Sequence, residues 1–443
     1  MLSFNVLGCA LILCVVVFSW RRFTSPLWVV PGPFLSRFTS VPLRWHDFRA
    51  NRTPYIHKLH LTYGPAVLIA PNEVSFTSFE AVKEIYGSSG SGYEKSNFYN
   101  LFTVFGRRTM FSTLDKTSAS AFTHWVFAFN KYANSNVMKP ASLSGIQNLV
   151  TEFARQCEDG ATSVDIYIKG RLLILHAPTI YRYASKIINL FFEARATPLA
   201  DAFVLQRSRY PDTAEFTLLS RLREKLGDQL TEIDVSAECL DHMVAGIDTT
   251  GDVLCFLMWE LSQPRSEHHQ ARLREELLRN PTEAFDKLPY LDSVVQEGLR
   301  CFPAIPMSLP RVVPDGGRVI DNVQVPGGTI VSCQAHSVQR HNEHVFPDPD
   351  RFDPGRWMSS KGADERKRHI FAFSYGGRGC VGKHLAVAEM KLLLREVYSR
   401  LQSIPDPTMS DDSMRSHDQI ISARPYGQKC LLHFMRASES NCP

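Results

Sequence analysis

A single cysteine, Cys380, stands between a glycine-rich loop and an amphipathic helix. The ten residues from Phe373 to Gly382 read F-S-Y-G-G-R-G-C-V-G. Glycines tolerate positive φ angles, so this backbone can approach a flat group closely. The dipole and free N–H groups of a helix N-terminus favour the thiolate form of cysteine. The segment therefore predicts a thiolate ligand presented to a metal ion. The alternative is a tight turn with an inert, buried cysteine.

The same loop matches the pattern F-x-x-G-x-R-x-C-x-G at every specified position, and by this match it resembles the heme-binding signature of the cytochrome P450 family. The resemblance implies heme b as the cofactor, with Cys380 as the axial ligand of its iron. It also places Phe373 in the cofactor site and Arg378 on a heme propionate. Thiolate ligation favours cleavage of the O–O bond. The implied fold is mainly α with a minor β-sheet region, the cytochrome P450 fold behind an N-terminal transmembrane helix.

The N-terminus is the most apolar part of the chain. The nineteen residues from Leu2 to Trp20 carry no charge, and Arg21 and Arg22 follow at once. As a helix this stretch is about 29 Å long, close to the hydrocarbon thickness of a bilayer. A cleaved signal peptide is the competing interpretation, but a basic start and a small-residue cleavage site are missing. Residues 1–22 are therefore expected to form a membrane anchor.

The arginines after this segment favour a cytosolic position for the rest of the chain. We expect a single-pass protein of the endoplasmic reticulum membrane with a cytosolic catalytic domain. The sequon Asn51-Arg52-Thr53 should then carry no glycan. Residues 23–33, which are rich in proline, are expected to form a stiff, non-helical linker, and residues 34–443 one heme domain.

Composition excludes some other classes of function. A net charge of +4 without a basic stripe gives no support for nucleic-acid binding. The ten cysteines form no C-x-x-C pair, which is typical of reduced, mostly buried thiols in a cytosolic domain.

Hydrophobic periodicity predicts the main elements of the domain. A strand is expected at Ala66–Ala70, and extended structure continues over Glu73–Phe76. The expected helices are Asp234–Leu261, Arg265–Leu278 and Tyr290–Leu299. Strand-like pieces at Arg318–Val325 and Thr329–Val338 follow, separated by a proline-glycine turn.

The longest predicted helix contains the segment A-G-I-D-T-T at residues 245–250. Thr249 can bond back to the carbonyl of Ala245, which would loosen the helix and make room for a small ligand. The segment resembles the oxygen-activation motif of the family, which implies that Asp248 and Thr249 relay protons to iron-bound dioxygen. A solvated polar patch on an ordinary helix is the alternative.

Three further arginines have expected roles. Glu297 and Arg300 can pair on one helical face, and Arg351 follows in the segment P-D-R-F. These residues resemble the E-x-x-R and P-E-R-F motifs, which implies a buried structural triad of Glu297, Arg300 and Arg351. In the segment L-P-R, Arg311 resembles the arginine that donates to a heme propionate, although it could also be a surface residue.

The segment D-E-R-K-R-H at residues 364–369 is a basic cluster just before the cysteine loop. A solvated face is one interpretation. The other is docking of an acidic reductase through Arg366, Lys367 and Arg368. The resemblance implies electrons from NADPH through a cytochrome P450 reductase, with cytochrome b5 as an additional donor.

Two regions depart from the family pattern. In the family, basic or tryptophan residues that bind a propionate usually lie in an arginine-rich run here, but residues 115–140 contain no arginine. The indole N–H of Trp125 can donate, and His124 or Lys131 could substitute for the missing charge. The middle region, 142–233, is shorter than the family's pair of pocket-roofing helices requires, so the lid over the substrate is expected to be reduced.

Three functions remain open from the sequence. The leading one is a monooxygenase that acts on a lipophilic organic substrate, a secondary-metabolite intermediate by similarity to fungal members. The second is a heme-thiolate isomerase or dehydratase that needs no reductase. The third is a non-catalytic, membrane-tethered protein with impaired heme binding.

Overall fold

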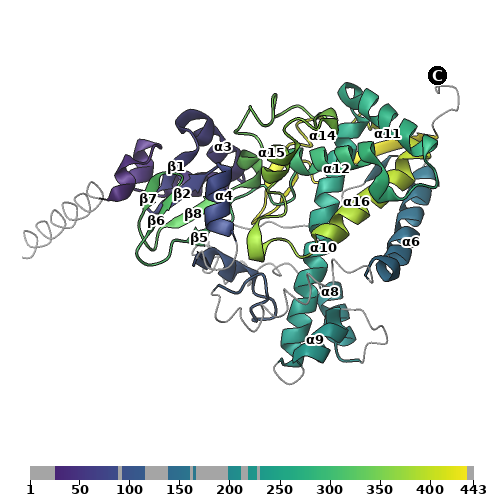
Figure 1. Ribbon diagram of the computed structural model, residues 1–443. Coiled ribbons are helices and arrows are strands. Elements are labelled where there is room, and N and C mark those ends of the chain that lie inside the picture. Colours follow the sequence, from purple (N-terminus) through teal and green to yellow (C-terminus); the bar gives the residue numbers. More distant parts are fainter. Residues whose placement is uncertain are drawn as a thin grey trace, which may run out of the picture.

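The computed structural model describes residues 25–87, 92–114, 138–159, 163–165, 198–210, 218–226 and 230–436. Helices dominate this part of the chain, and the strands gather mainly at the N-terminal end (Figure 1). The α-helices are α2 (Val41–Phe48), α3 (Arg52–Tyr63), α4 (Phe79–Tyr86), α6 (Met138–Asp159), α8 (Pro198–Arg207), α9 (Leu218–Leu226), α10 (Glu232–Ser262), α11 (Glu267–Arg279), α12 (Pro289–Cys301), α13 (Ala335–Val338), α14 (Gly355–Met358), α15 (Ala363–Arg368) and α16 (Lys383–Tyr398).

Small sheets complete the fold. The largest has the strand order β1-β2-β8-β5-β3, in which β2 and β8 are parallel and the other pairs antiparallel. A second sheet has the order β4-β12-β9, and β6-β7 and β10-β11 form separate pairs. The strands are β1 (Ala66–Ala70), β2 (Glu73–Phe76), β3 (Glu94–Lys95), β4 (Val164–Asp165), β5 (Arg311–Val312), β6 (Arg318–Ile320), β7 (Val323–Val325), β8 (Ile330–Cys333), β9 (Leu401–Pro405), β10 (Ser416–Asp418), β11 (Ala423–Pro425) and β12 (Leu431–Arg436).

The predicted mainly α fold with a minor sheet region is confirmed, and so are its principal elements. β1 and β2 have the predicted bounds, and α10, α11 and α12 lie within a few residues of theirs. The predicted strand 318–325 is a hairpin of β6 and β7, because Asp321 and Asn322 adopt positive φ angles and turn the chain.

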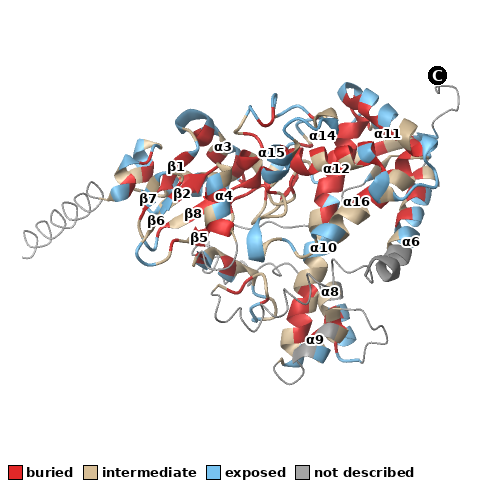
Figure 2. Cartoon of the chain, viewed as in Figure 1, coloured by how far each residue is buried: buried red, intermediate tan, exposed pale blue. Residues whose placement is uncertain are grey.

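Helix α10 runs through the centre of the helical half (Figure 1). A capping box starts it, in which Thr231 and Asp234 each bond to the other's backbone. The half that begins at Thr250 is buried among α11, α12 and α16, as Figure 2 shows. Thr249 Oγ1 does donate to the carbonyl of Ala245, over 2.6 Å. However, the prediction that this bond loosens the helix was wrong, since α10 is continuous from Glu232 to Ser262.

The N-terminal predictions are only partly covered by the structure. The predicted anchor at residues 1–22 lies outside the described residues. None of the described helices combines the length and the apolar character needed to cross a bilayer. The linker was wrongly predicted to be non-helical throughout, because Pro26–Val29 form a 3₁₀ turn with proline at its first position. Leu27 and Val30 belong to the same buried hydrophobic cluster as residues of β1, β2 and β7, so this segment is part of the domain core.

A buried carboxylate connects α12 to the segment that follows α13. Glu297 and Arg300 are both fully buried and form two hydrogen bonds of 2.8 Å. Arg356 Nε donates to Glu297 Oε1 over 3.0 Å, and Trp357 Nε1 donates to Oε2 over 2.8 Å. The backbone N–H of Asp353 adds a further bond. The charge of Glu297 is thus compensated by two cations and two neutral donors.

The second arginine of this triad is Arg356, so the prediction of Arg351 was wrong. The side chain of Arg351 is exposed, and the residue contributes its carbonyl oxygen, which accepts from Arg300 and Arg356. The reason is the backbone turn after Phe352, which brings α14 rather than residue 351 against α12. A second proline-x-arginine-aromatic segment, Pro354 to Trp357, was the signal that sequence reasoning passed over.

Replacing Arg356 by alanine should therefore destabilise the fold far more than replacing Arg351. Arg356→Ala leaves a buried carboxylate short of one cation, and we expect a loss of about 3 kcal/mol in the free energy of unfolding. Arg351→Ala removes an exposed side chain and should cost less than about 0.5 kcal/mol. Urea unfolding of the two variants measures the difference. Equal losses would contradict the assignment.

One buried histidine, His60, and two half-buried ones, His57 and His336, lie on α3 and α13. The rings of His57 and His336 meet edge to face with centroids 4.9 Å apart. Burial lowers the pKa of His57 to about 4, with Arg340 adding to the effect, and burial lowers the pKa of His60 to about 4 as well. The unfolded chain binds protons on these rings below about 6.5, whereas the folded chain binds them only below about 4. Both rings therefore favour unfolding as the pH falls through this window.

The variant His57→Gln should lose less stability in acid than the parent protein. Relative to the variant, the parent should lose about 2–3 kcal/mol of unfolding free energy between pH 7 and pH 4, and the loss should stop below pH 4. Comparing the two proteins at each pH cancels the contributions of other titrating groups. Denaturant titrations at several pH values measure the difference, and parallel pH profiles would contradict it.

Candidate cofactor site

The cysteine loop is folded around the backbone of its own glycines. Residues Gly376–Arg378 form a 3₁₀ turn, and the N–H of Cys380 donates to the carbonyl of Phe373 over 2.9 Å. Gly376 has a φ of +70°, and a Cβ atom there would lie 2.0 Å from the carbonyl oxygen of Tyr86. Only glycine fits this position. The loop is thereby fixed between α4 and the start of α16, and it leaves Cys380 exposed.

The Cys380 thiol precedes the first helical residue of α16, Lys383, by three positions. Burial raises the pKa of this thiol, while the N–H groups of Gly382 and Lys383 and the Lys383 charge lower it by a smaller amount. The residue as a whole is exposed, so the desolvation reflects the protein packed around the loop rather than enclosure on every side. The predicted lowering of the Cys380 pKa by the helix N-terminus is therefore smaller than the rise that burial causes. A metal ion at the sulfur would supply the missing positive charge.

Helix α10 packs against α16 and carries the other predicted groups. Its middle part, Ala245–Ile247, is exposed, although the following turns of the helix are buried. A Cβ atom built on Gly246 or Gly251 would meet no heavy atom within 4 Å. A flat group thus has room against this part of α10.

Asp248 and Thr249 lie in this open stretch. Asp248 Oδ2 accepts from Arg424 Nη2 over 3.0 Å. Sequence reasoning missed this ion pair, because Arg424 lies on β11, 176 residues further along the chain. Thr249 bonds to Ala245, as predicted. The proton-relay role of the two residues remains a prediction.

Three cationic side chains converge on the other side of the loop. Arg311 on β5 is buried, and its Nη1 has no hydrogen-bond partner among the described residues. Its guanidinium lies over the rings of Tyr86 and Tyr99, with its Cζ atom 5.5 and 5.8 Å from their centroids. Lys95 on β3 is also buried, and burial holds its pKa well below the usual range, with the charges of Arg311 and Arg378 acting in the same direction.

Arg378 is the third member of this cationic cluster. Its Nη1 donates to the carbonyls of Thr113 and Leu114 over 3.1 and 3.3 Å. Asp241 offsets the positive charge near Lys95 only in part. A buried excess of positive charge is unfavourable until an anion compensates it. Together, the open wall of α10, the Cys380 thiol and this cationic cluster fit an iron porphyrin with two carboxylate side chains. Sequence reasoning missed Lys95, because no motif marks this lysine as part of a cofactor site.

Phe373 contributes to the cysteine loop through its backbone carbonyl and its ring. Its side chain has no polar group to offer to a ligand. Its carbonyl accepts from Cys380, its side chain packs against the helical core, and the ammonium of Lys383 lies 5.8 Å from its ring centroid. The arginine-poor segment 115–140 lies outside the described residues except for the start of α6. Within 142–233 the structure describes most of α6, β4, α8 and α9, so the expected reduction of the lid remains a prediction.

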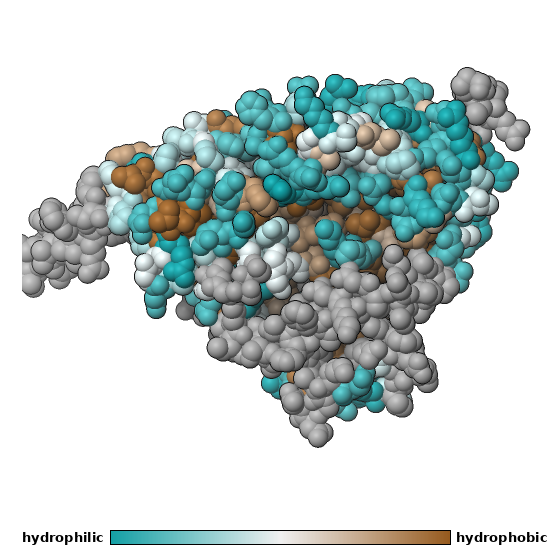
Figure 3. Space-filling model, viewed as in Figure 1, coloured by the Kyte–Doolittle hydropathy of each residue, from teal (hydrophilic) through white to brown (hydrophobic). Residues whose placement is uncertain are grey.

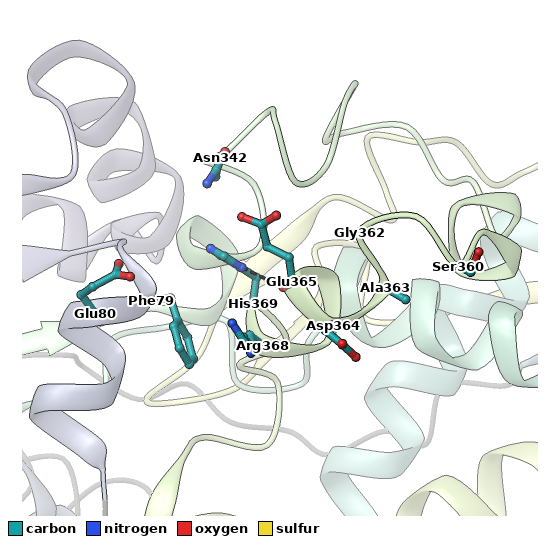
Figure 4. Close-up of a pocket in the computed structure, with 10 residues that line it drawn as sticks. All are labelled: Phe79, Glu80, Asn342, Ser360, Gly362, Ala363, Asp364, Glu365, Arg368 and His369. Carbon is teal, nitrogen blue, oxygen red and sulfur yellow. Dashed lines mark hydrogen bonds between the residues drawn. The ribbon is translucent and has the colours of Figure 1, made fainter.

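The basic cluster at residues 364–369 divides into two kinds of side chain. Lys367 and Arg368 are exposed, whereas Arg366 is buried and donates to the carbonyls of Lys361 and Ser359. The expectation that Arg366 serves as a surface contact was therefore wrong. A hollow of about 470 Å³ lies between α4 and α15. Figure 4 shows that acidic side chains, such as Glu80 and Glu365, line it beside Arg368 and His369.

The seven cysteines in the described part of the chain form no disulfide bond with one another, and five of them are buried. This confirms, for those residues, the prediction of reduced and mostly buried cysteines.

The comparisons with known proteins agree with this fold. The family model described as Cytochrome P450 matches residues 176–431, more than half of the chain. The cytochrome P450 monooxygenase stcB of Emericella nidulans is 30% identical over 92% of this chain and 88% of its own length. The cytochrome P450 monooxygenase orf2 of Aspergillus niger is 26% identical over 96% of both chains.

A solved structure, a retinoic acid-bound cyanobacterial CYP120A1, has a TM-score of 0.66 with 18% identity, covering 86% of this chain and 93% of its own. At that identity the likeness shows the fold alone. Together with the family match, a helical fold with a cysteine loop before its last long helix defines a heme-thiolate protein. The chain belongs to the cytochrome P450 family, and it is an enzyme of the cytochrome P450 monooxygenase class.

Replacing Arg311 by lysine should weaken heme retention while the fold persists. A lysine keeps the charge, but it cannot present the two parallel N–H groups with which arginine binds a carboxylate. We expect heme affinity to fall by about tenfold. The heme-to-protein ratio after gel filtration measures it, with the exposed Arg279→Lys on α11 as control. Unchanged retention in both variants would contradict a propionate role for Arg311.

Proposed function

We propose that this protein is a heme-thiolate monooxygenase that inserts one oxygen atom from O₂ into a lipophilic organic substrate. The observation that carries the proposal is the Cys380 loop, whose glycines fix an exposed thiol just ahead of α16. Heme b with a thiolate axial ligand supplies oxygen activation when it is bound. Cys380 would hold its iron, and Arg311, Arg378 and Lys95 would hold its two propionates.

The groups on α10 would serve the proton supply. Asp248 has a side chain that is 33% exposed, so it can exchange protons with water, and it accepts a hydrogen bond from Arg424. The Thr249 hydroxyl donates to Ala245, which leaves its oxygen lone pairs available as acceptors. Asp248 and Thr249 would supply the protons that oxygen activation consumes.

The substrate class is inferred from relatives. The two fungal proteins named above are described as cytochrome P450 monooxygenases, and a third, tazI of Aspergillus terreus, is 28% identical over 95% of this chain and 96% of its own length. With such relatives, a lipophilic intermediate of secondary metabolism is the substrate we propose. The exposed, largely apolar middle of α10 is compatible with such a molecule.

Electrons would come from NADPH through a cytochrome P450 reductase, with cytochrome b5 as an additional donor. The exposed Lys367 and Arg368 support docking of an acidic partner at α15. Acidic residues share that surface, so the attraction rests on those two side chains rather than on the whole segment.

The protein would sit at the endoplasmic reticulum membrane with its catalytic domain in the cytosol. Large apolar side chains are exposed in the first described segments, and Figure 3 shows apolar residues close to that end of the molecule. They are Val29, Phe34, Leu35, Val41, Trp45 and Phe48. Apolar surface of this kind next to an uncharged N-terminal stretch supports contact with lipid.

A heme-thiolate isomerase or dehydratase is the second candidate. Such an enzyme rearranges a peroxide and does not need protons delivered to dioxygen. The acid and hydroxyl pair on α10 favours the monooxygenase. Dependence of product formation on NADPH and reductase discriminates between the two.

The Cys380→Ala variant should lose the Soret band characteristic of thiolate-ligated heme in the carbon monoxide-bound, reduced protein. The reason is that alanine offers the iron no ligand atom. Cys239→Ser, at a cysteine of α10 that is only partly buried, should retain that band and serves as the control. Persistence of the band in Cys380→Ala would show that another residue holds the iron.

A further inference from the structure

Helix α10 carries a second acid that the proton path described above does not use. Asp252 follows Asp248 by four residues, so the two side chains lie on one face of the continuous helix. The Asp248 side chain is 33% exposed, whereas Asp252 is only 4% exposed. Among the described residues, Asp252 Oδ2 has no hydrogen-bond partner. A buried carboxylate in this position calls for an explanation.

A single arginine faces both acids. Arg424 is 5% exposed and donates from Nη2 to Asp248 Oδ2 over 3.0 Å. Burial raises the pKa of Asp252 to about 7, the charge of Arg424 opposes this rise, and the charge of Asp248 adds to it. The next ionisable group along α10 is Cys255, whose thiol bonds to Cys430 and is buried, both of which raise its pKa, so it stays neutral.

The charges of this group of three residues balance only when one proton is present. One guanidinium and two carboxylates carry a net negative charge in a place largely removed from water, which is unfavourable. One guanidinium, one carboxylate and one carboxylic acid are neutral overall. Moving the proton from one acid to the other keeps that total constant, so the transfer requires little electrostatic work.

We propose that Asp252 is a proton store for Asp248, and that Arg424 moves its hydrogen bonds to whichever of the two carboxylates is ionised. The inference rests on the proposed monooxygenase function and deepens it. In the transfer, the O–H bond of the Asp252 carboxylic acid breaks and an O–H bond forms on Asp248, directly or through one water. No electrons are exchanged. Asp252 becomes the carboxylate that Arg424 neutralises, and it is reloaded from solvent through Asp248.

A proton store at Asp252 would help to meet the proton requirement of monooxygenation. Monooxygenation takes up two protons and two electrons for each O₂, and it releases one oxygen atom as water. Asp248 alone holds one proton and must refill from water between the two deliveries. A protonated Asp252 one turn away shortens that refilling step. Asp252 and Arg424 therefore act through Asp248 as positioning residues.

Infrared spectroscopy of the resting, purified protein tests the store without any substrate. The carbonyl stretch of a protonated carboxylic acid is separate from the bands of a carboxylate. Burial raises the pKa of Glu238 to about 8 and that of Asp418 to about 7, so these acids contribute bands of their own. We therefore expect the difference spectrum, parent minus Asp252→Asn, to contain one such band at pH 6 that fades as the pH rises to 9. Asparagine mimics the shape and neutrality of the protonated acid, so the variant should fold. Glu232→Gln, at the exposed start of the same helix, is the matched control.

A second variant tests the coupling even if Asp252→Asn fails to fold. In Asp248→Asn the repulsion between the two acids is gone, and the charge of Arg424 acts on Asp252 alone. The acid band should then titrate at a pH at least one unit lower than in the parent, which corresponds to about a tenfold change in the proton affinity of Asp252. An unshifted titration would overturn the coupling through Arg424.

Turnover provides the functional readout, with a substrate identified by its effect on the heme spectrum. We expect product formation by Asp252→Asn to fall by about tenfold, less than the ~10²-fold typical for removing a direct acid–base group, because Asp248 remains. The solvent deuterium isotope effect should rise, and Glu232→Gln should change neither quantity. Full activity in Asp252→Asn overturns the proposal. So does reduced activity without loss of the infrared band, since Asp252 would then act through packing alone.

Discussion

The buried carboxylate of Glu297 is the interaction on which the cofactor site depends. It gathers donors from Arg300, Arg356, Trp357 and the backbone of Asp353, which come from two separate parts of the chain. A charge with so many fixed partners tolerates little displacement, because losing any partner leaves it uncompensated. The relative position of α12 and α14 is set by this single group.

The same network reaches the cysteine loop through buried hydrogen bonds. Arg300 Nη1 donates to the carbonyl of Gln339, and Gln339 Nε2 donates back to the carbonyls of Leu299 and Arg300. Gln339 Oε1 then accepts from the N–H of Phe371, two residues before the loop begins. Gln339 is fully buried, so these bonds are shielded from water and retain their geometry. The position of Cys380 thus follows from a carboxylate more than eighty residues earlier in the chain.

Local sequence was sufficient to predict most of this architecture and insufficient for its long-range pairs. The loop at Cys380, the bounds of β1 and β2 and the extent of α10 follow from glycines, alternation and helical periodicity, which act over a few residues. Arg351 was chosen over Arg356 because both follow a proline and precede an aromatic residue, and the choice depends on a backbone turn at Asp353. The pairing of Asp248 with Arg424 and the approach of Lys95 to Arg311 depend on sheet positions that no local pattern encodes.

The cationic cluster and the cysteine complement each other in the charge that they present. Lys95, Arg311 and Arg378 place more positive charge in the protein interior than Asp241 offsets, and burial accordingly holds the pKa of Lys95 well below its usual range. The Cys380 thiol is held in its neutral form by desolvation. Each arrangement is unfavourable alone. Heme would relieve both, because its carboxylates would neutralise the cationic cluster and its iron would bind the sulfur. A ligand that binds only the folded chain stabilises it, so heme would stabilise the fold through both groups together.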